Sequence, residues 1–377
     1  MIYKLGKIGV TEGMSLIAMI TLPNIYLSAP SVTIGFVGSC AWLLNLVSGI
    51  IAVAILLKIT QCYQLYCQRF HNGKCIDFYQ FTKELLGNKM AWFVFFCWMV
   101  LFELQTIIML REFADQVLIT TLPAHRLALI ILVIAICMIA IIWRGLEIIL
   151  RAAYISFCVT VIGIVITFLL LMGLFNYDYL FPLLGNGVSS IAKHSFSELG
   201  SWLMCFSVLF IAADLQKFSD IRRSIIYGVG YTIVLKIIII IAGILVFSSL
   251  IAPERVVLFY EMVQGINLSQ YVQRVDAIFI MMWMPAGLIS TVLLQFFAMM
   301  LFTRIFNLDD FKALIPLTVL LTAVFAMMPN SVVEAIELNK ILVYFISSVF
   351  FIANFLIFVG GYYLKCRRDA SCNGSVE

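Results

Sequence analysis

Long apolar runs dominate this chain and limit what it can fold into. Crossing a bilayer as an α-helix takes roughly 17 to 25 mostly apolar residues. Ten stretches meet that length: about 10–31, 35–59, 90–118, 126–143, 147–174, 197–216, 225–251, 275–304, 312–329 and 341–364. Charged residues make up 12% of the chain, about half of their share in soluble domains. We therefore predict an all-α integral membrane protein of about ten transmembrane helices, with residues 1–377 in a single transmembrane domain.

The basic residues predict the orientation of these spans. With the N-terminus inside, seventeen of the 24 Lys and Arg lie in inner segments, six lie in outer segments, and Lys236 lies within a span. Loops rich in Lys and Arg stay on the cytoplasmic side. We predict that both termini, the loop 60–89 and the tail 365–377 are cytoplasmic.

Three segments outside the spans have recognisable patterns. The loop 60–89 contains an amphipathic stretch that Asp77 is placed to cap and Gly87 to end, which predicts a short surface helix. The outer loop 175–196 is rich in aromatic residues, which favour the membrane interface. The polar tail after Leu364 is predicted to be disordered.

Several classes of function find no support in the residue pattern. A net charge of +4 does not indicate nucleic acid as a partner, the ten cysteines form no CxxC pair, and the three histidines are far apart. Neither a Ser-His-Asp set nor an HExxH motif occurs. We predict no metal site, no cofactor and no catalytic residues, and hence a protein that is not an enzyme.

The first span contains a feature that a membrane helix tolerates badly. Its middle reads MITLPNIYLSAPS, with Pro23 followed by Asn24. Proline removes a backbone donor and clashes with the preceding turn, and unwound backbone at membrane depth survives only inside protein or beside a cavity. We predict a break at Thr21–Tyr26 whose free backbone groups form one wall of a ligand site, as in transporters. A simple proline kink is the alternative.

Ten spans divide into five plus five, which is how inverted-repeat transporters are built. The first repeat would cover about 10–174 and the second about 197–364. The matching interruption would fall in the sixth span, at SWLMCFSVLFIAADL, whose middle has Cys205 and Ser207 but neither Gly nor Pro. We place the opposite wall of the site around Phe206 and Ser207, with Trp283 of the eighth span closing the pocket.

Two ionisable residues lie deep within spans, where such groups usually face the protein interior. Glu103 lies near the middle of the third span, and we predict that it faces the bundle interior and takes part in the site. Lys236 in the seventh span has three possible roles: it lines a cavity, it pairs with an acid, or it reaches the lipid headgroups.

Six stretches in order along the chain carry a resemblance to a known family: LIAMITLPNIYLSAPS, QRFHNGKCIDFYQFTKELLGN, LREFADQVLITTLP, RGLEIILRAAYIS, FNYDYLFPLLGNG and QRVDAIFIMMWMPAG. The chain resembles the permease-like B subunit of spore germinant receptors, within the amino acid–polyamine–organocation transporter superfamily. Relatives commonly have a glycine-rich break in the first span and a proline in the sixth, and this chain has neither.

The resemblance implies a fold of the leucine-transporter type, with a small-nutrient pocket between spans 1, 3, 6 and 8. It also implies a complex with two other receptor subunits, of A and C type, in the inner membrane of a spore. The candidate ligand-binding residues are Thr21, Leu22, Pro23, Asn24, Ile25, Tyr26, Glu103, Phe206, Ser207 and Trp283.

Three functions are consistent with this pattern. The first is a sensing subunit that binds a small nutrient such as an amino acid. The second is a proton- or sodium-coupled secondary amino-acid transporter, which Glu103 would suit. The third is a structural subunit whose pocket has decayed. Because the same fold serves all three, function has to be argued from the site.

Overall fold

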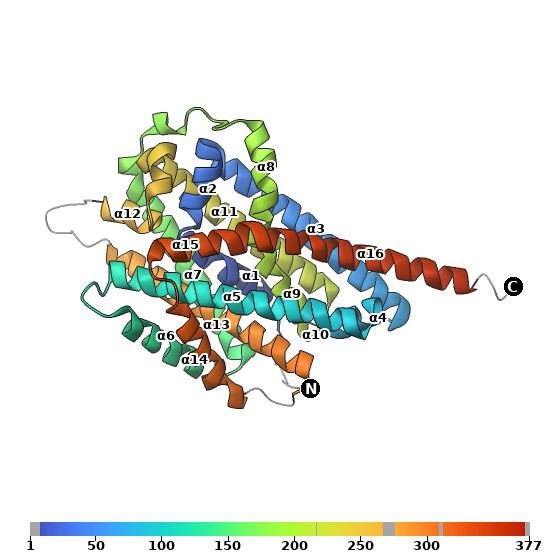
Figure 1. Cartoon of the computed structure of the whole chain (residues 1–377). Coiled ribbons are helices and arrows are strands. Elements are labelled where there is room, and N and C mark those ends of the chain that lie inside the picture. Colours follow the sequence, from blue (N-terminus) through green and yellow to red (C-terminus); the bar gives the residue numbers. More distant parts are fainter. Residues whose placement is uncertain (1–7, 216, 267–275, 309–311, 374–377) are drawn as a thin grey trace.

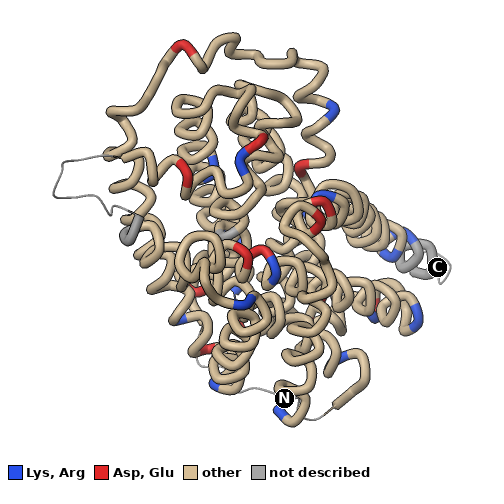
Figure 2. Tube along the Cα trace, turned by 60° about the vertical axis from the view of Figure 1, so that its left-hand side comes forward, with Lys and Arg blue, Asp and Glu red and all other residues tan. Residues whose placement is uncertain are grey.

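The computed structural model describes residues 8–215, 217–266, 276–308 and 312–373, and every regular element in them is a helix (Figure 1). Six helical segments are long and apolar enough to cross a membrane, and three shorter apolar helices accompany them. Together with the subdivided sixth span, they account for the ten predicted spans. Figure 2 shows that charged residues are sparse along the trace, as expected for a chain surrounded by lipid.

The first span is broken where the sequence predicts. Helix α1 covers Val10–Thr21, the 3-10 helix η1 covers Leu22–Ile25, and α2 covers Ala29–Val37. Pro23 has no N–H to continue the α-helical ladder, so the chain tightens into a 3-10 turn and restarts as a helix six residues after Pro23. The broken first helix is thereby confirmed, and its second half runs six residues past the predicted end of the span.

The second span is longer than predicted. Helix α3 covers Ala41–Phe70, so it occupies the first third of the predicted loop 60–89. Its 30 residues correspond to about 45 Å, well beyond the ~30 Å hydrocarbon core. The predicted surface helix follows as α4, Phe78–Leu86, between Asp77 and Gly87. The Asp77 carboxylate accepts a hydrogen bond from Arg304 Nη1 (2.7 Å) and caps no helix.

The third to fifth spans are α5 (Asn88–Thr120), α6 (Leu127–Ile142) and α7 (Leu146–Leu171), and η3 (Met172–Leu174) extends the last of these. The outer segment that follows contains η4 (Tyr177–Leu180) and α8 (Val188–Glu198).

The sixth span is interrupted although it has neither Gly nor Pro between residues 201 and 215. It consists of the 3-10 helix η5 (Leu199–Phe206) and two one-turn helices, α9 (Ser207–Phe210) and α10 (Ala212–Leu215). Ile211, between the two short helices, has a φ of −106° and a ψ of 11°. The first span of each half is therefore broken, and the symmetry is more complete than the sequence pattern indicates.

The remaining chain begins with α11 (Phe218–Ile251), η6 (Ala252–Glu254) and α12 (Leu258–Gln264). It continues with α13 (Asp276–Phe306), η7 (Lys312–Leu314), α14 (Ile315–Ala326) and α15 (Val332–Lys340). A π-helical turn, η8 (Ile341–Ser347), joins α15 to α16 (Ser348–Asn373).

The predicted disorder after Leu364 is wrong for residues 365–373, because α16 continues through Asn373. Lys365 Nζ donates to the Tyr66 hydroxyl (2.9 Å) and to the backbone carbonyl of Glu84. These contacts fasten α16 to α3 and α4, and Figure 1 shows α3 and α16 extending together from the bundle. Packing of one long apolar helix on another therefore overrides the polar composition of its last turns.

Helix α1 lies at the centre of the bundle and positions the break. It packs against α7, α11 and α13, and every residue from Ser15 to Thr21 is buried. A helix that is apolar on all sides is stable only when it is surrounded by other elements. Helices α6 and α14 lie together at the periphery (Figure 1).

Candidate functional site

Aromatic rings from four elements gather beside the break. The ring centroid of Tyr26 lies 5.6 Å from that of Phe259 on α12 and 6.1 Å from that of Phe279 on α13. Phe279 in turn lies 5.8 Å from Trp283, which contacts Phe113 of α5 at 5.2 Å. The structure thus brings Tyr26 and Trp283 into one aromatic cluster, which also contains Phe113, Phe259 and Phe279.

Polar atoms of this region have no hydrogen-bond partner among the described residues. They include Tyr26 OH, Trp283 Nε1 and Asn24 Oδ1. Further examples on α5, α9 and α13 are both side-chain amide atoms of Gln116, Ser207 Oγ and Ser290 Oγ. A buried polar group left unpaired costs about 1–3 kcal/mol, so such groups call for an explanation. They belong to spans 1, 3, 6 and 8, which the resemblance places around the nutrient. Thr160 Oγ1 of α7, in the fifth span, is unpaired as well.

The other predicted residues of the break are buried but differ in their surroundings. The Thr21 hydroxyl donates to the Ile17 carbonyl (2.7 Å) and lies 3.3 Å from the Thr232 hydroxyl of α11. Leu22 and Ile25 are buried in the core. Asn24 is half-buried, and its side-chain oxygen has no partner in the described chain.

The sixth span contributes less directly than predicted. The Phe206 ring packs against Trp98 of α5 (5.1 Å) and Phe351 of α16 (5.4 Å), which places it in an aromatic core with those helices. Ser207 is fully buried. Its unpaired hydroxyl makes it the stronger candidate of the two.

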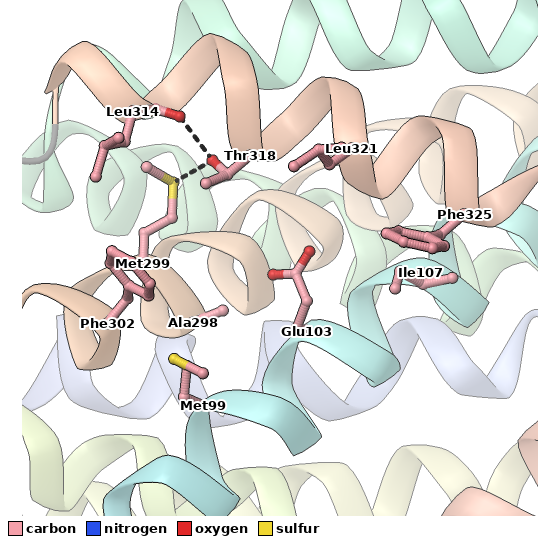
Figure 3. Close-up of a pocket in the computed structure, with 10 residues that line it drawn as sticks. All are labelled: Met99, Glu103, Ile107, Ala298, Met299, Phe302, Leu314, Thr318, Leu321 and Phe325. Atoms are coloured by element: carbon pink, nitrogen blue, oxygen red, sulfur yellow. Dashed lines mark hydrogen bonds between the residues drawn. The ribbon is translucent and has the colours of Figure 1, made fainter. Parts of the chain in front are cut away.

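Glu103 belongs to a different part of the bundle. It bonds Gln295 of α13 and Thr322 of α14 and faces a pocket of about 270 Å³ (Figure 3). Nine residues separate it from Glu112 on the same helix, which is about 14 Å. Twelve residues separate Gln295 from Trp283 on α13, about 18 Å. The structure therefore does not bring Glu103 together with Tyr26 and Trp283.

A buried acid near the break was missed by the sequence analysis. Glu112 is 5% exposed, and it accepts hydrogen bonds from Ser28 Oγ (3.2 Å) and from Asn339 Nδ2 of α15 (2.7 Å). It thus ties α5 to Ser28, in the turn after η1, and to α15. Its position near the end of the third span resembles an ordinary interfacial charge, so only its neighbours reveal it.

A buried charge pair flanks this acid on α5. Arg111 Nε donates to Asp115 (2.7 Å), and Arg111 Nη1 donates to the Pro329 carbonyl (2.6 Å). Both side chains are about 5% exposed. The i,i+4 spacing of the two residues is the one sequence signal that points to this pair.

The cavity between Glu112, Gln116 and Leu27 is small. Its volume is about 20 Å³, which is enough for one water molecule. This cavity is therefore too small for an amino acid in this conformation.

Lys236 lies in the interior and does not reach the headgroups. It is 6% exposed, and its Nζ lies 3.4 Å from Ser201 Oγ and 4.3 Å from the centroid of the Trp202 ring. The Ser201 hydroxyl lies 3.1 Å from Glu198 Oε1, so a hydroxyl bridges a buried base and a buried acid. Such pairing is the usual way to keep a cation in a bundle.

Ten spans with interrupted first helices in both halves define the leucine-transporter type of fold. A Na+-coupled sialic acid symporter shares this fold with a TM-score of 0.65 at 12% identity, over 96% of this chain and 80% of that one. The manganese transporter of Eremococcus coleocola gives a TM-score of 0.61 at 12% identity, over 91% of this chain and 76% of that one. Among curated proteins, none matches the chain significantly.

Within this fold class the sequence itself identifies the family. Residues 7–335 match the spore germination protein family of permeases, and the chain belongs to that family.

Proposed function

We propose that this protein is the nutrient-sensing, permease-like subunit of a spore germination receptor. The observation that carries the proposal is the break of the first span, where an aromatic cluster meets buried polar groups without partners. A small molecule with an apolar part and several polar groups, such as an amino acid, would complement both. Free backbone groups of η1 would add contacts of the kind that broken helices offer.

The small cavity beside the break supports a two-state mechanism. The space beside Glu112 and Gln116 has room for one water molecule, so a nutrient that entered there would require movement of the neighbouring helices. A nutrient that binds one conformation more tightly shifts the population towards it. Partner subunits of A and C type in the spore inner membrane would then detect that shift.

A proton- or sodium-coupled amino-acid transporter is the second candidate, and the transporter fold favours it. Uptake into sealed vesicles distinguishes the two functions. Saturable accumulation of a bound amino acid, driven by a proton or sodium gradient, would identify a transporter. Binding without accumulation would identify a sensor.

Replacing Tyr26 by Phe should weaken ligand binding without lowering the stability of the protein. Because the hydroxyl makes no hydrogen bond of standard geometry, although the Thr160 hydroxyl of α7 lies near it, its removal should change the melting temperature little. If the nutrient bonds this hydroxyl, affinity should fall about tenfold, which corresponds to ~1.4 kcal/mol. The measurement is a binding screen of purified wild type against amino acids, sugars and nucleosides, followed by titration of both proteins with the compound that binds.

Tyr63→Phe is the matched control, because the Tyr63 hydroxyl donates to the Ile76 carbonyl. This variant should lose stability and keep its affinity. Unchanged affinity in Tyr26→Phe would remove that hydroxyl from the site.

The cytoplasmic placement of both termini is part of the proposal and rests on the basic residues. The natural cysteines of the inner segment are poor reporters, because Cys67 is fully buried and burial raises the pKa of the Cys75 thiol to about 11. Lys74 and Ser189 are exposed in the predicted inner and outer segments. In intact vegetative cells, a membrane-impermeant thiol reagent should label Ser189→Cys above the wild-type background and leave Lys74→Cys unlabelled. The reverse pattern would invert the topology.

A further inference from the structure

Glu103 closes a ring of three side chains between α5, α13 and α14. Gln295 Nε2 lies 3.0 Å from Glu103 Oε2, and Thr322 Oγ1 lies 2.5 Å from Glu103 Oε1. The third side of the ring joins Thr322 Oγ1 to Gln295 Oε1 at 2.9 Å. Three short contacts therefore need three hydrogens.

If Glu103 is ionised, the ring has one hydrogen fewer than its three contacts need. The Gln295 amide nitrogen supplies a hydrogen to one contact, and the Thr322 hydroxyl has a single hydrogen for another. An ionised carboxylate supplies none, so one pair of oxygens would face each other with no hydrogen between them. The Thr318 carbonyl, 2.9 Å from the Thr322 hydroxyl, is a further acceptor for the same hydrogen.

The count does not depend on which way the Gln295 amide is turned. Exchanging its oxygen and nitrogen moves its hydrogen to the Thr322 contact, and the contact with Glu103 Oε2 then lacks one. In either orientation the third hydrogen has to come from the glutamate. A protonated Glu103 completes the ring, with every donor facing an acceptor.

We propose that Glu103 is a proton-binding site whose proton joins α5 to α13 and α14, and whose release loosens that contact. The ligand of this site is a proton. The site is separate from the proposed nutrient site and does not depend on it. Loss of the proton converts one hydrogen bond of the ring into a contact between two acceptors, which is unfavourable inside a bundle.

The surroundings of the ring favour the neutral acid. The pocket beside it is lined, apart from Glu103 and Thr318, by apolar residues of α5, α13, η7 and α14 (Figure 3). A buried carboxylate without a counter-charge tends to become neutral. Figure 3 shows the Glu103 carboxyl directed into the space between these helices, while the Thr318 hydroxyl bonds Met299 Sδ and the Leu314 carbonyl.

No other titratable side chain lines this pocket. Several titratable residues of the elements packed around the ring have other partners: Arg111 and Asp115 bond each other, Arg304 bonds Asp77, Glu112 bonds Ser28 and Asn339, and Cys137 of α6 lines a different cavity. The others are distant along their helices: Lys89 and Cys97 lie 14 and six residues before Glu103, Asp276 lies 19 residues before Gln295, and Lys312 lies ten residues before Thr322. Helix α14 has no charged residue between Ile315 and Ala326. The pH response of the ring is therefore assigned to Glu103.

Glu103→Gln reproduces the hydrogen pattern of the protonated acid, because its amide supplies one hydrogen and one acceptor. Infrared spectra of the purified full chain near neutral pH should show the carbonyl stretch of a protonated carboxyl group, which an ionised carboxylate lacks. The wild-type spectrum minus that of Glu103→Gln should contain this band. Replacement of the exposed Glu147, which pairs with Arg151, by Gln should remove no such band.

Thermal unfolding across pH provides the second readout. An unfolded glutamate titrates near pH ~4.3, so at neutral pH the folded protein would hold about one proton more than the unfolded chain. Stability then falls as pH rises, and one proton changes the unfolding equilibrium by up to about tenfold per pH unit. In Glu103→Gln, the slope of the unfolding free energy against pH should correspond to one proton fewer than in the wild type. Its melting temperature at low pH should equal that of the wild type.

Glu103→Leu is a second variant that removes the carboxyl group and also the hydrogen bonds that Glu103→Gln keeps. It should lose the same pH dependence and melt below Glu103→Gln, because it lacks two of the three contacts of the ring. A difference spectrum without the carboxyl band, or a pH dependence that is unchanged in both variants, would overturn the proposal.

Discussion

Asn24→Leu should abolish the response to the native nutrient while the protein still reaches the membrane. A leucine at the break adds apolar bulk and removes a side-chain donor and acceptor within η1. Overpacking of a buried site costs about 1–3 kcal/mol, and the loss of a hydrogen bond adds about 1 kcal/mol. Together they correspond to a loss of affinity of about 100-fold or more.

The measurement is the nutrient concentration that produces a half-maximal germination response in spores that carry each variant. Pro23→Ala should shift that concentration less, by letting the first helix re-form across the break. Asn88→Leu, the same substitution at an exposed residue near the start of α5, should leave the response unchanged. If Asn24→Leu and Pro23→Ala both respond at the wild-type concentration, Pro23 is only a kink and the site lies elsewhere.

Gly200→Ala should prevent accumulation of folded protein. A Cβ at Gly200 would lie 1.8 Å from the Val343 carbonyl oxygen and 2.7 Å from Ser348 Oγ. The Gly200 amide also donates to Ser348 Oγ (3.1 Å), so the sixth and tenth spans cannot separate without losing this bond. Because the obstacle is backbone rather than a flexible side chain, we expect a destabilisation of about 3 kcal/mol or more.

Gly230→Ala is the matched control, since a Cβ at that position of α11 meets no atom within 4 Å. Alanine is about 1 kcal/mol more favourable than glycine within a helix, so this variant should melt at or above the wild-type temperature. Thermal unfolding followed by size-exclusion chromatography of the detergent-solubilised protein distinguishes the two. A Gly200→Ala protein that melts like wild type would show that η5 and η8 can move apart at little cost.

Two ionisable side chains outside the proposed nutrient site, the buried Lys236 and the half-buried Glu103, differ in the charge of their partners. Lys236 has an acid, Glu198, within reach through the Ser201 hydroxyl, so both charges can persist in the interior. Glu103 has only neutral partners, Gln295 and Thr322. A charged pair fixes the packing of neighbouring spans at all moderate pH values, whereas an acid with neutral partners can gain or lose a proton.

The sequence by itself determined the class of the fold and the place of the first break. Apolar runs of membrane-spanning length leave the helix as the available structure, because backbone groups must be paired within lipid. Pro23 acts on its own turn, so its effect can be read locally. The ends of α4 were also predictable, since Gly87 with a φ of 85° stops a helix that Asp77 precedes.

Only the tertiary structure decided the second break, the ends of the long helices and the partners of the buried polar groups. Ile211 has no local property that interrupts a helix, so the surrounding spans must impose its conformation. The helix after Leu364 exists because Lys365 meets Tyr66 and Glu84. The burial of Glu112 and the ring around Glu103 depend on residues more than 180 positions away along the chain. Local propensity and hydropathy act over a few turns, whereas these contacts form only when distant helices pack together.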